Sequence, residues 1–165
     1  MNNQVFEKAV QAVNLLKEKN LKIATAESCT GGLVSGYITA VSGASAVFEL
    51  GVTSYSNEIK NAILKVDEET LKNFGAVSAN TAKLMAENVK TLAKADIGLS
   101  VTGVAGPASQ EGHPVGTVFI GVSGKNGTVT QKLAIDPKDR NFVREQAVFL
   151  LLEALIEYIE KYTEN

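Results

Sequence analysis

Apolar residues recur at helical spacing near both ends of the chain. Such spacing places them on one face of an amphipathic helix. In the segment 4–19 these residues are Val5, Phe6, Ala9, Val10, Val13 and Leu16. In the segment 139–162 they are Phe142, Ala147, Leu150, Leu151, Ala154, Leu155 and Ile159. Further helices are predicted over 31–41 and 58–64. Another helix is expected to begin at a cap on Asp67 and end at Gly75, and a longer one to begin at a cap on Ser78.

Between these helices lie shorter apolar or alternating segments that predict strands. "LKIATAES" (21–28) and "DIGLSVTG" (96–103) read as buried strands, and "VFELGVTSYS" (47–56) as a third. Two alternating segments, 117–123 and 128–135, flank "GKNG", a typical hairpin turn. Helices thus alternate with strands before a hairpin follows. This order predicts one α/β domain over 1–165, with a mixed sheet covered by helices.

The composition narrows the class of protein. The chain has 165 residues, enough for one domain with a core, and its net charge of −2 gives no sign of general nucleic-acid binding. No apolar run reaches the ~18 residues of a membrane span, and no signal peptide is evident. The single cysteine excludes an intrachain disulfide. We therefore expect a cytoplasmic protein with neither a nucleic-acid nor a membrane partner.

The chain has few residues that bind transition metals. It contains one histidine, His113, and one cysteine, Cys29, which cannot form a zinc site of several His and Cys ligands. No compact acidic cluster points to magnesium. We expect no metal. A Ser-His-Asp triad would have to use His113, in the segment "QEGHPVG".

The segment "AESCTGG" (26–32) carries the first candidate chemistry. Ser28 and Thr30 lie where a buried strand ends and a helix begins, the usual place for ligands in α/β sheets. Gly31 and Gly32 allow close approach of a ligand, and unpaired N–H groups at the helix start suit an oxyanion or phosphate. Alternatively, Ser28 or Thr30 only caps the helix. Cys29 is interpreted as a packed thiol.

A serine nucleophile needs a base, and "SYSNEIK" (54–60) supplies two candidates, Tyr55 and Lys60. A desolvated lysine has a lowered pKa and can act as a neutral base. The alternative is that Lys60 lies on a solvated helix face.

Two further segments suit a polar ligand. "VTGVAGPASQEG" follows the second buried strand, and Thr102, Gly103 and Gly106 in it are candidate substrate contacts. "DPKDRNFVRE" places Arg140 and Arg144 four residues apart on one helix face, which suits an anion such as phosphate. The alternative is a salt bridge to Asp136, Asp139 or Glu145.

Taken together, the chain resembles the CinA C-terminal domain family from about Val10 to Leu155. The resemblance rests on "AESCTGG", "SYSNEIK", "GAVS", "TGVAGP", "PVGTV" and "DRNFVRE" in this order and spacing. It implies a three-layer α/β/α fold, a homo-oligomer, and no metal or cofactor. Stand-alone members hydrolyse the carboxamide of nicotinamide mononucleotide, a by-product of NAD turnover, to nicotinic acid mononucleotide and ammonia.

By this resemblance Ser28 is the nucleophile, Lys60 and Tyr55 assist it, and Arg140 and Arg144 bind the substrate's phosphate. The resemblance does not decide between Lys60 and Tyr55 as the base. One segment departs from the family, whose loop after "AGP" commonly carries Gly-Gly and ends in lysine. Here the shorter "ASQEGH" puts His113 at that place. The remaining alternatives are a non-catalytic nucleotide-binding or interaction module and a structural oligomer.

Overall fold

Five strands form one mixed sheet in the order β2-β1-β3-β4-β5. The structure is a computed structural model, and it describes residues 2–163. The central strands β1 (Ile23–Glu27) and β3 (Ile97–Gly103) run parallel to each other, and β2 (Phe48–Thr53) is parallel to β1. The hairpin of β4 (Thr117–Gly124) and β5 (Gly127–Ala134) adds two antiparallel pairings. The predicted mixed sheet and the hairpin before the last helix are confirmed.

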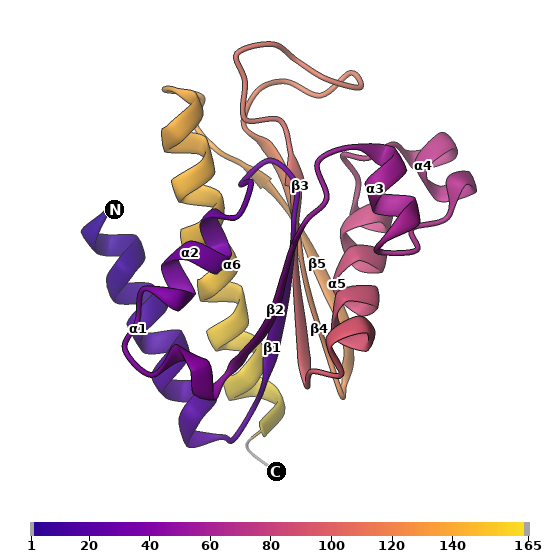
Figure 1. Cartoon of the computed structure of the whole chain (residues 1–165). Coiled ribbons are helices and arrows are strands. Elements are labelled where there is room, and N and C mark those ends of the chain that lie inside the picture. The colour runs from indigo at the N-terminus through magenta and orange to yellow at the C-terminus, as the bar shows by residue number, and fades with distance from the viewer. Residues whose placement is uncertain (1, 164–165) are drawn as a thin grey trace.

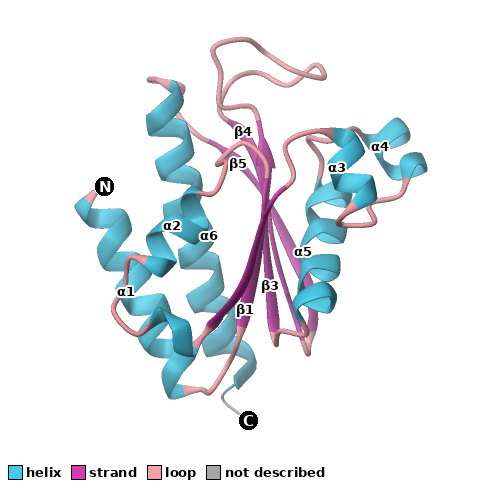
Figure 2. Cartoon of the chain, viewed as in Figure 1, coloured by secondary structure: helices cyan, strands magenta, loops and turns pink. Residues whose placement is uncertain are grey.

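Helices cover both faces of the sheet, as Figures 1 and 2 show. One layer holds α1 (Asn3–Glu18), α2 (Leu33–Thr39) and α6 (Arg140–Thr163). The other holds α3 (Asn57–Ala62), α4 (Glu68–Phe74) and α5 (Ala79–Ala93). A short 3₁₀ turn, Ala44–Ala46, lies between α2 and β2. The fold is therefore the expected three-layer α/β/α domain. Within residues 2–163, no helix combines the length and hydropathy that crossing a membrane requires.

The predicted apolar faces are the ones that the helices bury. Ala9, Val13 and Leu16 of α1 and Leu151 and Leu155 of α6 share one core with the sheet. The α5 residues of the opposite layer are also buried, and they include Ala82, Met85, Ala86 and Val89. Burial of these side chains is the main stabilising term of the fold.

The sheet brings three segments to one edge. Because β2, β1 and β3 are parallel neighbours, the chain leaves all three at the same end, the upper end in Figure 1. Two predicted boundaries were wrong there. The helix expected from Gly31 begins at Leu33, since Gly31 and Gly32 have φ of 59° and 95°. The strand expected to reach Ser56 ends at Thr53.

Candidate active site

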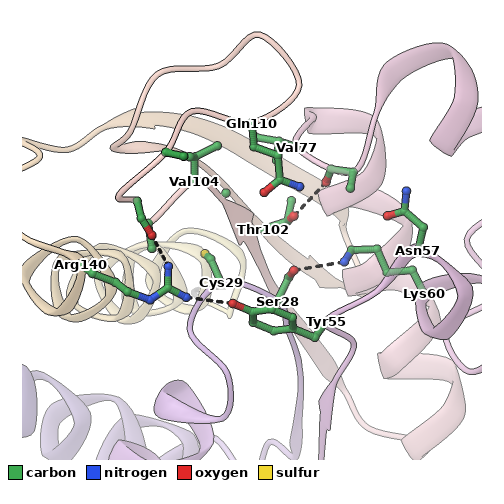
Figure 3. A pocket seen from close by; sticks show the side chains of 15 residues that line it. Ser28, Cys29, Tyr55, Asn57, Lys60, Val77, Thr102, Val104, Gln110 and Arg140 are labelled. Atoms are coloured by element: carbon green, nitrogen blue, oxygen red, sulfur yellow. Dashed lines mark hydrogen bonds between the residues drawn. The ribbon is translucent and has the colours of Figure 1, made fainter.

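A pocket opens at this upper edge of the sheet (Figure 3). Its wall combines the ends of three parallel strands with the β3–β4 loop, the segment before α5, and the start of α6. The lining residues are Ser28, Cys29, Tyr55, Asn57, Lys60, Ala76, Val77, Thr102, Gly103, Val104, Ala105, Gly106, Ala108, Gln110 and Arg140. Thus the structure gathers Ser28, Tyr55, Lys60, Thr102, Gly103, Gly106 and Arg140 of the predicted site in one place.

Lys60 contacts Ser28 directly. Its Nζ donates a hydrogen bond to Ser28 Oγ at 3.1 Å and another to the Ser54 carbonyl at 2.8 Å. The short helix α3 brings Lys60 to this point, and the hydroxyl of Ser56 caps the helix by accepting from the Ile59 N–H at 3.2 Å. Lys60 is only 1% exposed, so the alternative of a solvated lysine is wrong.

Burial also changes the proton affinity of Lys60. Desolvation disfavours the charged ammonium and lowers the pKa of Lys60, while Cys29 and the Glu111 carboxylate oppose this shift. No Asp or Glu among residues 2–163 forms an ion pair with the amine. The neutral amine, which can accept a proton from a hydroxyl, is therefore more accessible than in an ordinary lysine.

Tyr55 is held by Arg140 and not by the Ser28–Lys60 pair. Tyr55 is 61% exposed, and its hydroxyl accepts a hydrogen bond from Arg140 Nη2 at 2.8 Å. Arg140 Nη1 donates to the Gly106 carbonyl. The guanidinium thus joins the segment after β2 to the β3–β4 loop at the edge of the pocket (Figure 3). In the described part of the chain neither Arg140 nor Arg144 makes an ion pair, so the salt-bridge alternative is wrong.

The start of α2 is occupied by a buried carboxylate, Glu27. Glu27 is 1% exposed and is the last residue of β1. Its two oxygens accept three backbone N–H groups at 2.8–3.0 Å and two hydroxyls at 2.7 Å, from Gly32, Val34, Ser35 and Thr30. A negative group is favourable at a helix N-terminus, and these bonds offset its desolvation.

This arrangement corrects one expectation from the sequence. The N–H groups at the helix start were expected to be unpaired and open to a ligand. Instead, those of Gly32, Val34 and Ser35 donate to Glu27, and that of Gly31 donates to the Ser28 carbonyl at 3.1 Å. Sequence reasoning missed Glu27, although an acidic residue directly before a glycine-rich helix start was a usable signal.

Four of the predicted substrate contacts lie outside the pocket wall, namely Thr30, Gly31, Gly32 and Arg144. Thr30 is buried and donates to Glu27. Arg144 donates to the carbonyls of Cys29 and Thr30, at 3.2 and 2.7 Å. In this structure these residues hold the turn that carries Ser28, and their contact with a substrate stays a prediction.

The thiol of Cys29 and the ring of His113 have no catalytic role in this arrangement. Burial raises the pKa of the Cys29 thiol to about 12, so it is a thiol at neutral pH, in agreement with a packing role. The ring of His113 lies edge-on to Phe119, with 6.0 Å between centroids, and His113 is not part of the pocket wall. A triad of Ser28 with His113 is therefore not formed.

Two carboxamide side chains, Asn57 and Gln110, line the pocket and were not predicted as site residues. Their positions depend on tertiary contacts that no local pattern reveals. Thr102 was predicted, but its hydroxyl already donates to the Ala76 carbonyl at 2.8 Å. In the described part of the chain, no three His, Cys, Asp or Glu side chains gather as a metal site requires.

Fold and site together define the class: a three-layer α/β domain with a half-buried serine bonded to a buried lysine at the carboxyl edge of its sheet. The chain belongs to the CinA C-terminal domain family, which matches residues 6–159. A competence-damage inducible protein of Thermoanaerobacter is 49% identical over 148 residues, covering 89% of this chain and 36% of that protein. The chain thus spans about one third of the length of the curated relatives it matches.

Solved structures of the family have the same fold. A CinA superfamily protein from Klebsiella pneumoniae is 32% identical, with a TM-score of 0.93 over 98% of this chain and 100% of that one. The competence/damage inducible protein CihA from Agrobacterium tumefaciens is 35% identical, with a TM-score of 0.91 over 95% of this chain and 96% of that one.

Proposed function

We propose that this chain is a nicotinamide mononucleotide deamidase, with Ser28 as nucleophile and Lys60 as general base. The observation that carries the proposal is the 3.1 Å contact between Lys60 Nζ and Ser28 Oγ inside the pocket. The resemblance noted from the sequence supplies the substrate, and the buried lysine supplies the chemistry. Tyr55 is assigned a supporting role, because its hydroxyl bonds to Arg140 and not to Ser28.

The reaction proceeds in two halves. Neutral Lys60 accepts the Ser28 hydroxyl proton as Oγ forms a bond to the carboxamide carbon. The C–N bond then breaks, the Lys60 proton goes to the leaving nitrogen, and ammonia departs from an ester on Ser28. Water next adds to the ester while Lys60 accepts its proton. The Ser28–acyl bond breaks, Ser28 recovers its proton, and nicotinic acid mononucleotide leaves.

The tetrahedral oxyanion needs a donor, and we assign it to the N–H of Cys29. Cys29 follows Ser28 directly and lines the pocket. Further along the turn, the N–H groups of Gly31 and Gly32 donate to the Ser28 carbonyl and to Glu27 instead. A backbone donor fixed before the reaction stabilises developing charge without reorganisation.

Arg140 is proposed to bind the substrate's phosphate. Its guanidinium lies on the pocket wall and bonds only to neutral acceptors, the Tyr55 hydroxyl and the Gly106 carbonyl. Phosphate oxygens are stronger acceptors for it. Arg140→Ala should therefore weaken binding of the mononucleotide by about 2–5 kcal/mol if the pair is desolvated, and leave that of nicotinamide riboside nearly unchanged. Equal losses on both compounds would contradict this assignment.

The proposal is tested by measuring ammonia release from nicotinamide mononucleotide by the purified chain. Turnover is the expected result. Binding without ammonia release would favour the alternative, a nucleotide-binding module with the same fold. Neither binding nor release would favour a structural oligomer.

A further inference from the structure

The β3–β4 loop ends in a tight hairpin beside the pocket, residues 110–113, which we call the lid hairpin. Gln110 and His113 exchange two backbone hydrogen bonds, at 3.2 and 2.8 Å. The two central residues, Glu111 and Gly112, have φ of 52° and 76°. Positive φ at both centres is the pattern of a type I′ turn. The lid hairpin is therefore a defined local structure.

Glu111 holds the lid hairpin against the pocket wall by a side-chain hydrogen bond, which we call the fastening. Its Oε2 accepts the N–H of Val77 at 3.0 Å, and Val77 lies on the pocket wall. A Cβ at Gly75 would overlap this carboxylate oxygen, so a side chain there would have to displace the Glu111 carboxylate from its present position. Glutamate is also a poor choice for a left-handed turn position, where Gly, Asn or Asp is favoured. Its side-chain contact gives a reason for its presence.

Fastening the lid hairpin places the carboxamide of Gln110 in the pocket. Figure 3 shows this side chain pointing into the cavity from the side opposite Ser28. Within residues 2–163 the Gln110 carboxamide has no hydrogen-bond partner, so both its donor and its acceptor are available. A second carboxamide is complementary to this side chain, because its NH₂ group can donate to the Gln110 oxygen while its carbonyl oxygen accepts from the Gln110 NH₂ group.

We propose that Gln110 hydrogen-bonds the substrate's carboxamide above Ser28, and that Glu111 is the positioning residue that holds Gln110 there through Val77. The proposal rests on the proposed function for the identity of the substrate. Glu111 touches no substrate, and it acts by fixing the lid hairpin. Gln110 selects compounds with a carboxamide at the reacting end of the pocket.

Hydrogen–deuterium exchange tests the fastening without any need for turnover. Glu111→Ala removes the acceptor of the Val77 amide and should speed exchange in segment 75–77. Glu111→Gln keeps an acceptor oxygen and should stay near the wild type. Glu160→Gln, an exposed change on the distant part of α6, is the matched control. Peptides of β3 and α5 report whether each variant remains folded. Unchanged exchange at 75–77 in a folded Glu111→Ala protein would overturn the fastening.

Calorimetry tests the contact with the substrate. Binding of nicotinamide mononucleotide is measured in a Ser28→Ala background, where it is not consumed. Gln110→Ala and Glu111→Ala should each weaken binding about two- to tenfold, the effect of one hydrogen bond, and Glu111→Gln should restore it. Unchanged binding in Gln110→Ala would overturn the contact.

Different results would contradict the role of Gln110 and the proposed deamidase activity. A wild-type chain that binds the mononucleotide but releases no ammonia contradicts the deamidase, while the binding series still decides the role of Gln110. A parent that does not bind the mononucleotide contradicts both.

Discussion

At the scale of single residues, the proposed reaction depends on the charge of Lys60. Because burial lowers its pKa, kcat/KM should rise with pH through that lowered value and level off above it. Lys60→Arg should be nearly inactive at every pH, since guanidinium does not release its proton usefully. The check is a pH–rate profile of both proteins, with Tyr55→Phe as a comparison. An active Lys60→Arg enzyme with an unchanged profile would remove Lys60 from the mechanism.

The lowered pKa of Lys60 also makes the stability of the fold depend on pH. The folded-state pKa of Lys60 lies below the unfolded value of about 10.4, so the unfolded chain binds more protons between these two values. Below the folded-state pKa, Lys60 therefore lowers the free energy of unfolding by the full amount that corresponds to its pKa shift. This destabilisation disappears as the pH rises to the unfolded value.

Glu27 carries a second residue-scale prediction. Glu27→Gln would place an NH₂ group against backbone N–H groups that now donate to the carboxylate. Leaving such buried donors without an acceptor costs about 1–3 kcal/mol each. We expect a lowered melting temperature and a reduced kcat, because the turn carrying Ser28 loses its support. Thermal unfolding and kcat are the measurements. A variant with wild-type melting and wild-type kcat would show that Glu27 does not hold the turn.

Site residues whose role follows from residue type and local position could be predicted from the sequence. Ser28 at a strand end and Lys60 five residues after Tyr55 lie together in the pocket, as their segments suggested. The partners of Glu27 and the placement of Gln110 could not be predicted in this way. They depend on side-chain directions and on a loop that reaches the distant residue Val77.

At the scale of elements, local signals predicted the helices and strands well. Asp67 and Ser78 cap α4 and α5 as expected, by accepting N–H groups of Thr70 and Thr81. The start of α2 was misplaced because Gly31 and Gly32 take left-handed conformations, which glycine allows but does not require. The β3–β4 loop carries no periodic pattern, so its hairpin at 110–113 was not foreseen.

Gly75 links two elements and gives an element-scale prediction. It ends α4 with φ of 82° and leaves the space that Glu111 occupies. Gly75→Ala should destabilise the fold by on the order of 1–3 kcal/mol, because a backbone with φ of 82° and ψ of 167° is strained for any residue with a Cβ. It should also displace the lid hairpin. Denaturant unfolding measures the first effect, and hydrogen exchange over 108–113 the second. Unchanged exchange there would show that the hairpin does not depend on Gly75.

At the scale of the whole molecule, most of the apolar core lies away from the pocket. The two larger buried apolar clusters lie between the sheet and its helices and reach the pocket wall only at Cys29 and Ala105, while the pocket itself lies at one edge of the sheet, where parallel strands end. Every residue to which we assign a role lies within this chain, although the chain spans about one third of its curated relatives. The chain should therefore carry out the proposed reaction by itself.

The most direct test of this account is the rate of ammonia release from nicotinamide mononucleotide by the wild type, Ser28→Ala and Cys29→Ser. The wild type should turn over, and Ser28→Ala should lose several orders of magnitude in kcat while remaining folded, because it lacks the nucleophile. Cys29→Ser should keep most activity, since its thiol has a packing role. Near-wild-type turnover by a folded Ser28→Ala protein would contradict the account.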